Sequence, residues 1–213
     1  MRNSLKYLRR LIVSLVLLPC TISANFPSSL FGFQQEQQTD ISVFLQWVRV
    51  LENHIKLDTP EGNCDEKSFN RCHLRNWQAF LGEIRQLPLK QQLTQVNRYA
   101  NSKKYILDMD NYGMSDYWAV AREFLYNGGD CEDYAIIKLF SLRWLGFSVE
   151  STRIVILQDT NLRVAHAVLA VENKGDIMIL DNQIEEVVSH KEIVHYSPVY
   201  SINENNWWLH LPN

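Results

Sequence analysis

A cysteine that follows two adjacent glycines is the residue of this chain best suited to chemistry, in the segment Gly128-Gly-Asp-Cys-Glu-Asp133. Adjacent glycines adopt positive φ angles without steric conflict, so they predict a tight turn. The residues from Cys131 to Leu145 then have the pattern of a helix that Gly146 ends. A helix N-terminus lowers the pKa of a thiol, and free N–H groups beside it can bind an oxyanion. Cys131 is therefore a candidate nucleophile.

Two further residues could complete a catalytic triad with Cys131. His166 lies among apolar residues, and a buried histidine needs a partner that fixes its tautomer. Asp181 directly follows the apolar run Ile177–Leu180. If the two segments pair as a hairpin, the two side chains lie at neighbouring positions on one face of the sheet. A cysteine, then a histidine on one strand, then an aspartate on the adjacent strand predicts a thiol hydrolase. The alternative is a core histidine, a capping aspartate and an inert cysteine.

Three acidic residues, Asp130, Glu132 and Asp133, surround the candidate nucleophile. Like charges disfavour a thiolate and raise the pKa of the thiol. A bound divalent cation would remove this conflict, because it becomes the largest local charge. The alternative interpretation is that these acids interact only with the helix dipole.

A second acidic segment, Asp108-Met-Asp-Asn-Tyr-Gly113, resembles the start of a calcium-binding loop. Asp108, Asp110 and Tyr112 stand at alternate positions and could supply oxygen ligands. The twelfth position is Ala119 rather than glutamate, so the segment is not an EF-hand. The missing oxygens could come from the turn at residues 130–133, which makes calcium the expected ion; the alternative is a solvated acidic turn.

Composition and the absence of other motifs narrow the function further. The 213 residues carry a net charge of −3, which excludes a broad nucleic-acid-binding footprint. Hydrophobic residues make up 46% and charged residues 21%, values typical of a folded globular chain. The chain contains no G-x-S-x-G, H-E-x-x-H or P-loop motif, so the commonest serine hydrolases and zinc proteases are excluded.

The first residues have the layout of a secretory signal peptide. Basic residues precede the short apolar run 11–18, and small residues follow up to Ala24. The run is too short to span a membrane, although an uncleaved anchor is the alternative. We therefore expect a signal peptide at 1–24, a polar leader at 25–39, one domain over 40–213, and an exported chain that is not embedded in the membrane.

Export bears on the cysteines, because disulfides form in oxidising compartments. Cys64 and Cys72 lie in a polar, loop-like stretch, and we expect them to form a disulfide; the alternative is two free thiols. Cys131 is then the unpaired thiol of the exported chain.

The periodicity of apolar residues predicts helices first and strands afterwards. The expected helices cover about 41–57, 73–87, 89–103, 116–125 and 131–145. The expected strands cover 149–157, 164–171, 177–180 and 193–202. This order predicts an α+β fold with N-terminal helices packed on an antiparallel sheet.

The residues around the cysteine also carry a family resemblance. Gly128-Gly-Asp-Cys-Glu-Asp-Tyr-Ala135, Ser141-Leu-Arg-x-Leu-Gly146 and Asp116-Tyr-Trp-Ala resemble the bacterial transglutaminase-like cysteine proteinases over roughly residues 40–205. The resemblance implies a papain/transglutaminase-like fold with Cys131 as nucleophile, His166 as base and Asp181 orienting the base. It also implies calcium ligands among the acids beside the cysteine. One departure is Val164, where the family pattern has glutamine.

The resemblance has further implications for substrate, location and partners. It implies a periplasmic protease that cuts the N-terminal region of a large exported adhesin at a small-residue site. It also implies an inner-membrane cyclic-di-GMP receptor that sequesters the protease and so controls biofilm attachment. Two alternatives stay open: a transglutaminase-like acyltransferase and a non-catalytic calcium-binding periplasmic module.

Overall fold

The helices precede most of the sheet in the chain, and a short hairpin at the N-terminus precedes the helices. The computed structural model describes residues 26–55, 60–65 and 70–213, so the predicted signal peptide at 1–24 lies outside the described residues. The α-helices are α1 (Leu45–Ile55), α2 (Arg71–Ile84), α3 (Leu89–Asn101), α4 (Asp108–Asn111), α5 (Ala121–Asn127) and α6 (Cys131–Leu145). The strands are β1 (Ser29–Leu30), β2 (Phe33–Gln38), β3 (Thr152–Asp159), β4 (Val164–Asn173), β5 (Asp176–Leu180), β6 (Val188–Ser189), β7 (Tyr196–Ile202) and β8 (Trp207–Leu211). Three 3-10 helices are η1 (Ile41–Val43), η2 (Val149–Ser151) and η3 (His190–Glu192).

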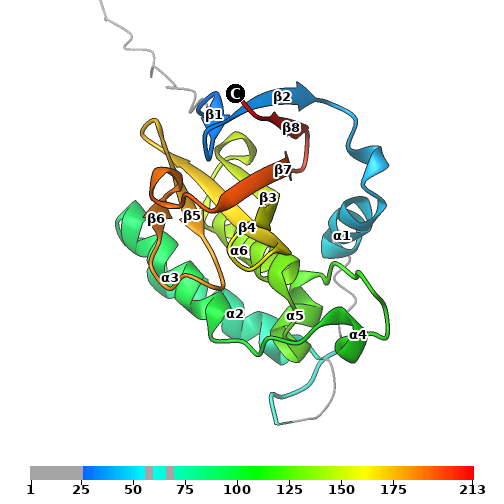
Figure 1. The fold of residues 1–213 in the computed structure, drawn as a ribbon. Helices are drawn as coiled ribbons and strands as arrows, with labels where there is room; N and C mark the ends of the chain where they lie inside the picture. The colour runs from blue at the N-terminus through cyan, green and yellow to red at the C-terminus, as the bar shows by residue number, and fades with distance from the viewer. Residues whose placement is uncertain (1–25, 56–59, 66–69) are drawn as a thin grey trace, which may run out of the picture.

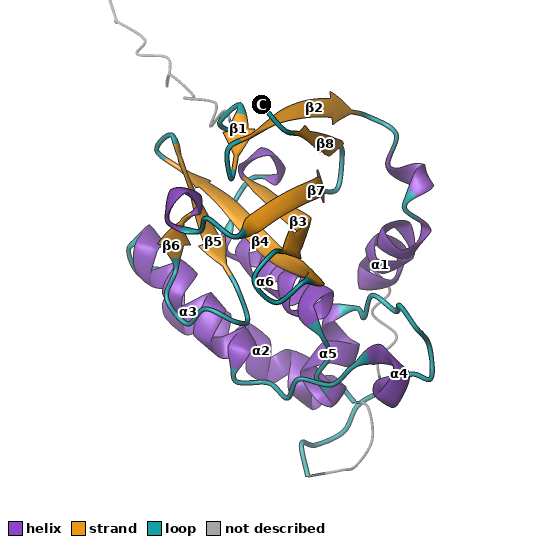
Figure 2. Ribbon diagram, viewed as in Figure 1, coloured by secondary structure: helices purple, strands orange, loops and turns teal. Residues whose placement is uncertain are grey.

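Helix α6 is the central helix of the fold. It packs on β3 and β4 with one side and on α2, α3 and α5 with others. Its residues Ile136, Ile137 and Leu139 are fully buried, as expected for a helix that is apolar on all sides. Figure 2 shows α2, α3, α5 and α6 on one side of the strands. The N-terminus of α6, which carries Cys131, is therefore held by the core.

The described strands form one antiparallel sheet in the order β1-β2-β8-β7-β3-β4-β5-β6. Buried apolar side chains line both of its faces. One set, including Ile154 and Leu169, joins the core shared with the helices. The other, including Leu30, Val168 and Tyr196, forms a second core that the N-terminal hairpin covers. The sheet is curled, since Phe31, in the turn between the edge strand β1 and its neighbour β2, contacts His190 next to the opposite edge strand β6. Figure 1 shows this blue hairpin beside the C-terminus.

The polar leader expected at residues 25–39 instead contains two strands of the sheet, β1 and β2. Strand β2 pairs with β8, with Gln34 opposite Leu211. Its Gln35 side chain accepts a hydrogen bond of 2.6 Å from the buried Arg153. The strand has no alternation of apolar and polar residues, which is the signal that sequence patterns depend on. The tertiary pairing makes it a strand.

The short helix expected over 116–125 begins later, at Ala121. Asp108–Asn111 forms one helical turn, α4, rather than the open loop that the calcium-loop pattern suggested. The other predicted helices and strands are present, with ends shifted by a few residues. The predicted α+β fold with antiparallel strands is confirmed.

Two further expectations concern the described part of the chain. Cys64 and Cys72 form a disulfide, as predicted, and Cys131 is the free cysteine among the described residues. None of the described helices combines the length and the apolar character needed to cross a membrane.

Candidate active site

Cys131 and His166 line the same cleft. The cleft has a volume of about 640 Å³ and lies between η1, the start of α1, the start of α6 and strand β4. The acidic residues Asp108, Asp130 and Glu132 line it as well. Residues of the predicted triad and of both predicted acidic segments therefore line one cleft.

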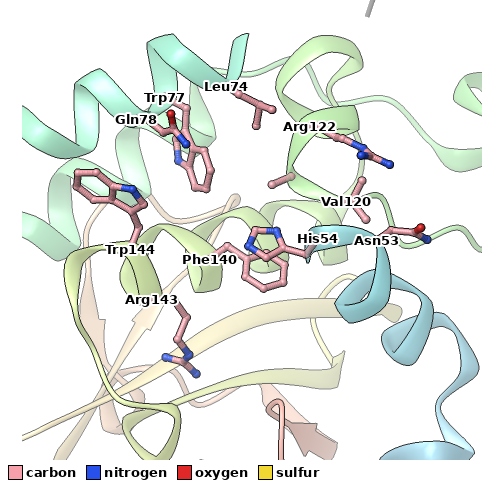
Figure 3. A pocket seen from close by; sticks show the side chains of 11 residues that line it. Asn53, His54, Leu74, Trp77, Gln78, Val120, Arg122, Phe140, Arg143 and Trp144 are labelled. Atoms are coloured by element: carbon pink, nitrogen blue, oxygen red, sulfur yellow. The ribbon is translucent and has the colours of Figure 1, made fainter. Parts of the chain in front are cut away.

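A second cavity, of about 330 Å³, lies between α1, α2, α5 and α6 (Figure 3). Its walls are partly aromatic, and the His54 ring stacks on Phe140 with centroids 3.6 Å apart. Burial lowers the pKa of His54, which favours the neutral ring. No cysteine or carboxylate lines this cavity among the described residues.

The two glycines before the nucleophile are required by their surroundings. Gly128 has a φ of +82°, in the left-handed region, and a Cβ there would collide with the Lys104 carbonyl oxygen. A Cβ on Gly129 would collide with the Asp133 carboxylate. The backbone N–H of Asp130 donates to that carboxylate at 3.3 Å and fixes the first turn of α6. The turn thus presents Cys131 at the helix N-terminus, as predicted.

His166 and Asp181 form a buried pair. His166 Nε2 is 2.9 Å from Asp181 Oδ1, and the residues are 2% and 1% exposed. The pairing of β4 with β5 positions them, since Leu169 lies opposite Leu180, the residue before Asp181. Hydrogen bonding to His166 lowers the pKa of the Asp181 carboxyl against the opposing effect of burial, so this residue is ionised at neutral pH.

Three residues that sequence reasoning missed hold Asp181 in place. The Tyr196 hydroxyl donates to Asp181 Oδ2 at 2.6 Å, and the Gln183 N–H donates to Oδ1 at 2.9 Å. The Asn101 side chain donates to the Asp181 carbonyl at 2.8 Å. The Gln183 side-chain amide also lies 3.4 Å from His166 Nδ1. The contacts of Tyr196 and Asn101 have no local sequence signal, because they join separate elements, whereas the Gln183 N–H lies only two residues from Asp181.

The thiol itself lies among carboxylates. Cys131 Sγ donates to Glu132 Oε2 at 3.2 Å. Burial raises the pKa of the Cys131 thiol, the charges of Glu132 and Asp130 raise it further, and a hydrogen bond from the Ala167 backbone opposes them. The conflict expected between the thiolate and its acidic neighbours is therefore present in the protein without a cation.

The acidic residues of two segments converge beside the thiol. One oxygen from each of Asp108, Asp130 and Asp133 lies within 4.8 Å of the others, and the same holds for Asp108, Asp116 and Glu132. Burial raises the pKa of Asp108 to about 6 and that of Glu132 to about 8. The charge of Asp130 contributes to both increases, so ionising its neighbours is disfavoured by repulsion as well as by burial.

One of the predicted metal ligands, Asp110, lies outside this cluster. Asp110 is exposed, because the helical turn α4 directs it away from its neighbour Asp108. The Tyr112 ring packs on Tyr117, with centroids 4.2 Å apart, and its role as a ligand stays a prediction. Asp116, which was not predicted as a ligand, joins the cluster.

The cluster fits a divalent cation. Asp108 Oδ1 and Asp130 Oδ1 are buried and have no hydrogen-bond partner within the described residues. Asp108 Oδ2 accepts a hydrogen bond from the Tyr117 N–H, and Asp133 Oδ1 accepts one from the Ala119 N–H. These hydrogen bonds hold the two carboxylates in position. An all-oxygen set of this size suits calcium, which takes six to eight oxygen ligands.

Comparisons with known proteins find one family model and several solved structures that match the chain. The family model described as bacterial transglutaminase-like cysteine proteinase BTLCP matches residues 62–213. A structure of Legionella pneumophila LapG is 32% identical to the chain, with a TM-score of 0.59, and the match covers 65% of this chain and 77% of that one. Two more Legionella pneumophila LapG structures are each 28% identical to the chain, with a TM-score of 0.61. The match to the calcium-bound structure covers 76% of this chain and 86% of that one. The match to the EGTA-treated structure covers 81% of this chain and 87% of that one. No curated protein matches the chain.

Proposed function

The chain belongs to the bacterial transglutaminase-like cysteine proteinases, and on this premise we propose that it is a calcium-dependent endopeptidase with a Cys131–His166–Asp181 triad. One observation carries the triad. A thiol at a helix N-terminus and a buried imidazole–carboxylate pair open on the same cleft. The papain/transglutaminase-like fold of the family places a nucleophile in this way, and the LapG structures share the fold.

The proposed roles follow from the hydrogen bonds. Because Asp181 holds His166 Nε2, the other ring nitrogen, Nδ1, is the one that takes the proton of Cys131. The thiolate attacks the scissile carbonyl carbon, and His166 returns the proton to the leaving amine. An acyl-enzyme forms, and water, deprotonated by the same histidine, releases the second fragment. The N–H groups at the start of α6 have no partners within the helix and are suited to bind the oxyanion.

We propose calcium as the ion of the acidic cluster. Asp108, Asp116, Asp130, Glu132 and Asp133 would hold it. Its charge would offset the carboxylates that disfavour the thiolate. The calcium-bound LapG structure supports this assignment, because the ion is named there for a protein 28% identical to this chain.

We further propose that the protease acts in the periplasm after removal of residues 1–24. Its proposed substrate is the N-terminal region of a large surface adhesin, and its proposed regulator is an inner-membrane cyclic-di-GMP receptor. The support is the signal-peptide layout of the N-terminus and the resemblance of the Gly128–Ala135 motif to adhesin-releasing members of the family.

The test compares three purified proteins on a recombinant adhesin N-terminal region, each with calcium and with a chelator. We expect wild type to cleave only with calcium and Cys131→Ala to be inactive. The double variant Cys64→Ser/Cys72→Ser is the matched control, since it removes the disulfide and leaves the cleft intact. Cleavage by Cys131→Ala would overturn the assigned nucleophile.

The same assay separates the alternatives. Incorporation of a labelled amine in place of hydrolysis would identify an acyltransferase. Calcium binding without any Cys131-dependent reaction would identify a binding module.

A further inference from the structure

Tyr196 contacts both members of the His166–Asp181 pair. It is 4% exposed, its hydroxyl donates to Asp181 Oδ2 at 2.6 Å, and its ring lies 5.7 Å from the His166 ring, centroid to centroid. Asp181 Oδ1 accepts from His166 and from the Gln183 N–H. Each carboxylate oxygen thus has its own donor. Rotation of the carboxylate toward any other partner would break the hydrogen bond from the tyrosine.

Phe31, in the N-terminal hairpin, fixes the ring of Tyr196. The two rings meet edge to face with centroids 5.6 Å apart. Phe31 has a φ of 51°, which is rare for a residue with a side chain, so its turn conformation is imposed by its contacts. One of those contacts is the hydrogen bond of 3.0 Å from its backbone N–H to His190 Nδ1.

His190 in turn belongs to the opposite edge of the sheet. It follows β6, is 5% exposed, and its Nε2 lies 3.8 Å from Asp176 Oδ1 at the start of β5. The bond from Phe31 to His190 therefore joins the two ends of the curled sheet directly beside Tyr196. Residues 26–38 lie outside the part of the chain that the family model matches, 62–213.

We propose that Tyr196 is a positioning residue of the protease, and that the N-terminal hairpin, through Phe31, keeps it in register with Asp181. The proposal rests on the proposed function, since positioning matters only if His166 acts as a base. Its physical reason is that a buried carboxylate oxygen deprived of its donor turns to find another. The histidine then loses its orientation while the cleft and the substrate contacts stay unchanged.

The test is Tyr196→Phe, which removes one hydroxyl and keeps the ring. We expect kcat on the adhesin fragment to fall about tenfold to hundredfold, with KM within about twofold, because the substrate does not touch this tyrosine. Phe31→Leu should show the same loss to a smaller degree. Tyr99→Phe is the matched control, because Tyr99 stacks on Phe80 in the helical layer and does not contact the pair.

A second measurement separates positioning from simple loss of stability. The proton NMR signal of the His166 Nε2–H, identified by its loss in Asp181→Asn, should broaden or shift in Tyr196→Phe and stay unchanged in Leu81→Ala. Leu81 is fully buried on α2 in the core shared with the helices, so its truncation weakens the fold without touching the carboxylate or the hairpin. Both variants are compared at a temperature where both are folded.

The outcomes are distinct from those of the proposed function. An unchanged NMR signal with kcat within twofold of wild type in Tyr196→Phe would overturn the positioning role. An equal loss of kcat in Leu81→Ala and Tyr196→Phe would overturn it as well. If instead the wild type proves not to be a protease, the NMR comparison still decides whether Tyr196 orients the pair.

Discussion

Replacement of Lys138 by methionine should stabilise the protein, and the gain should depend on pH. Lys138 lies in α6, seven residues after the nucleophile, and is 1% exposed. Its Nζ has no hydrogen-bond partner within the described residues and lies 5.7 Å from the centroid of the Tyr134 ring. Burial lowers the pKa of Lys138 to about 7, against the opposing attraction of Asp181. Methionine fills similar space without a charge.

The size of the effect follows from the two pKa values of the lysine. The unfolded chain keeps the ordinary lysine pKa of 10.5, and the folded protein has a value of about 7. Between these values the unfolded state binds one more proton, so the stability of wild type rises with pH. The penalty relative to methionine is about 4 kcal/mol at pH 7 and about 2 kcal/mol at pH 9, and it disappears above about pH 10.5.

The assay is urea denaturation of both proteins from pH 6 to pH 10 at one fixed calcium concentration. The difference in unfolding free energy between wild type and variant isolates the contribution of Lys138, because the acidic cluster titrates in both proteins. Lys90→Met is the matched control, because Lys90 is exposed on α3 and should change stability by less than about 0.5 kcal/mol at every pH.

A difference that does not vary with pH would refute the reasoning. So would a Lys138→Met protein that is less stable than wild type by about 3–5 kcal/mol, the result expected if the lysine and the Asp181 carboxylate form a buried ion pair. That second outcome would make Lys138 a charge partner of the triad.

Four other predictions concern the active site. Asp181→Asn should lower kcat by about a thousandfold or more, since the amide favours the wrong imidazole tautomer. Steady-state kinetics at saturating calcium measure this loss, and a near-normal kcat would remove Asp181 from the proposed triad. The melting temperature of chelated protein should fall as pH rises from about 4.5 to about 8, because the folded state holds the proton of Glu132 more tightly than the unfolded state does. A hundredfold excess of calcium over its Kd should add about 2.7 kcal/mol, a rise of roughly 5–10 °C, and an indifferent melting temperature would refute a structural role for the ion. Gly129→Ala should destabilise the protein by about 1–3 kcal/mol and weaken calcium binding in titration calorimetry, because the added Cβ collides with Asp133. The control Gly82→Ala on α2 should have a neutral or stabilising effect.

The parts of the site that are local in the chain could be predicted from the sequence. The turn before Cys131 and the helix after it depend on the glycines, the cap and the apolar run within one short segment. The meeting of His166 with Asp181 follows from one hairpin with a short turn, which also has a local signal. For such features the residues in contact are close neighbours in sequence, so their types and spacing already contain the geometry.

The second acidic segment shows where spacing misled. Its alternate oxygen-bearing residues fit a loop, but the chain makes a helical turn there, and the turn separates Asp110 from Asp108. Asp116 enters the cluster because the chain folds back after α4. Which carboxylates converge depends on backbone directions that no residue spacing encodes.

The N-terminal hairpin was decided by tertiary structure alone. Strand β2 is rich in glutamine and lacks alternation, so nothing within it favours a strand, and it forms one because β8 and Arg153 offer its backbone and side chains partners. The same holds for Tyr196, whose hydroxyl is distinguished from any other only by the buried carboxylate it meets. The sequence by itself determined the candidate nucleophile, its helix and the hairpin of the histidine and aspartate. The closure of the sheet around that pair required contacts between residues more than one hundred and fifty positions apart, such as Phe31 and His190, and only the folded chain brings these together.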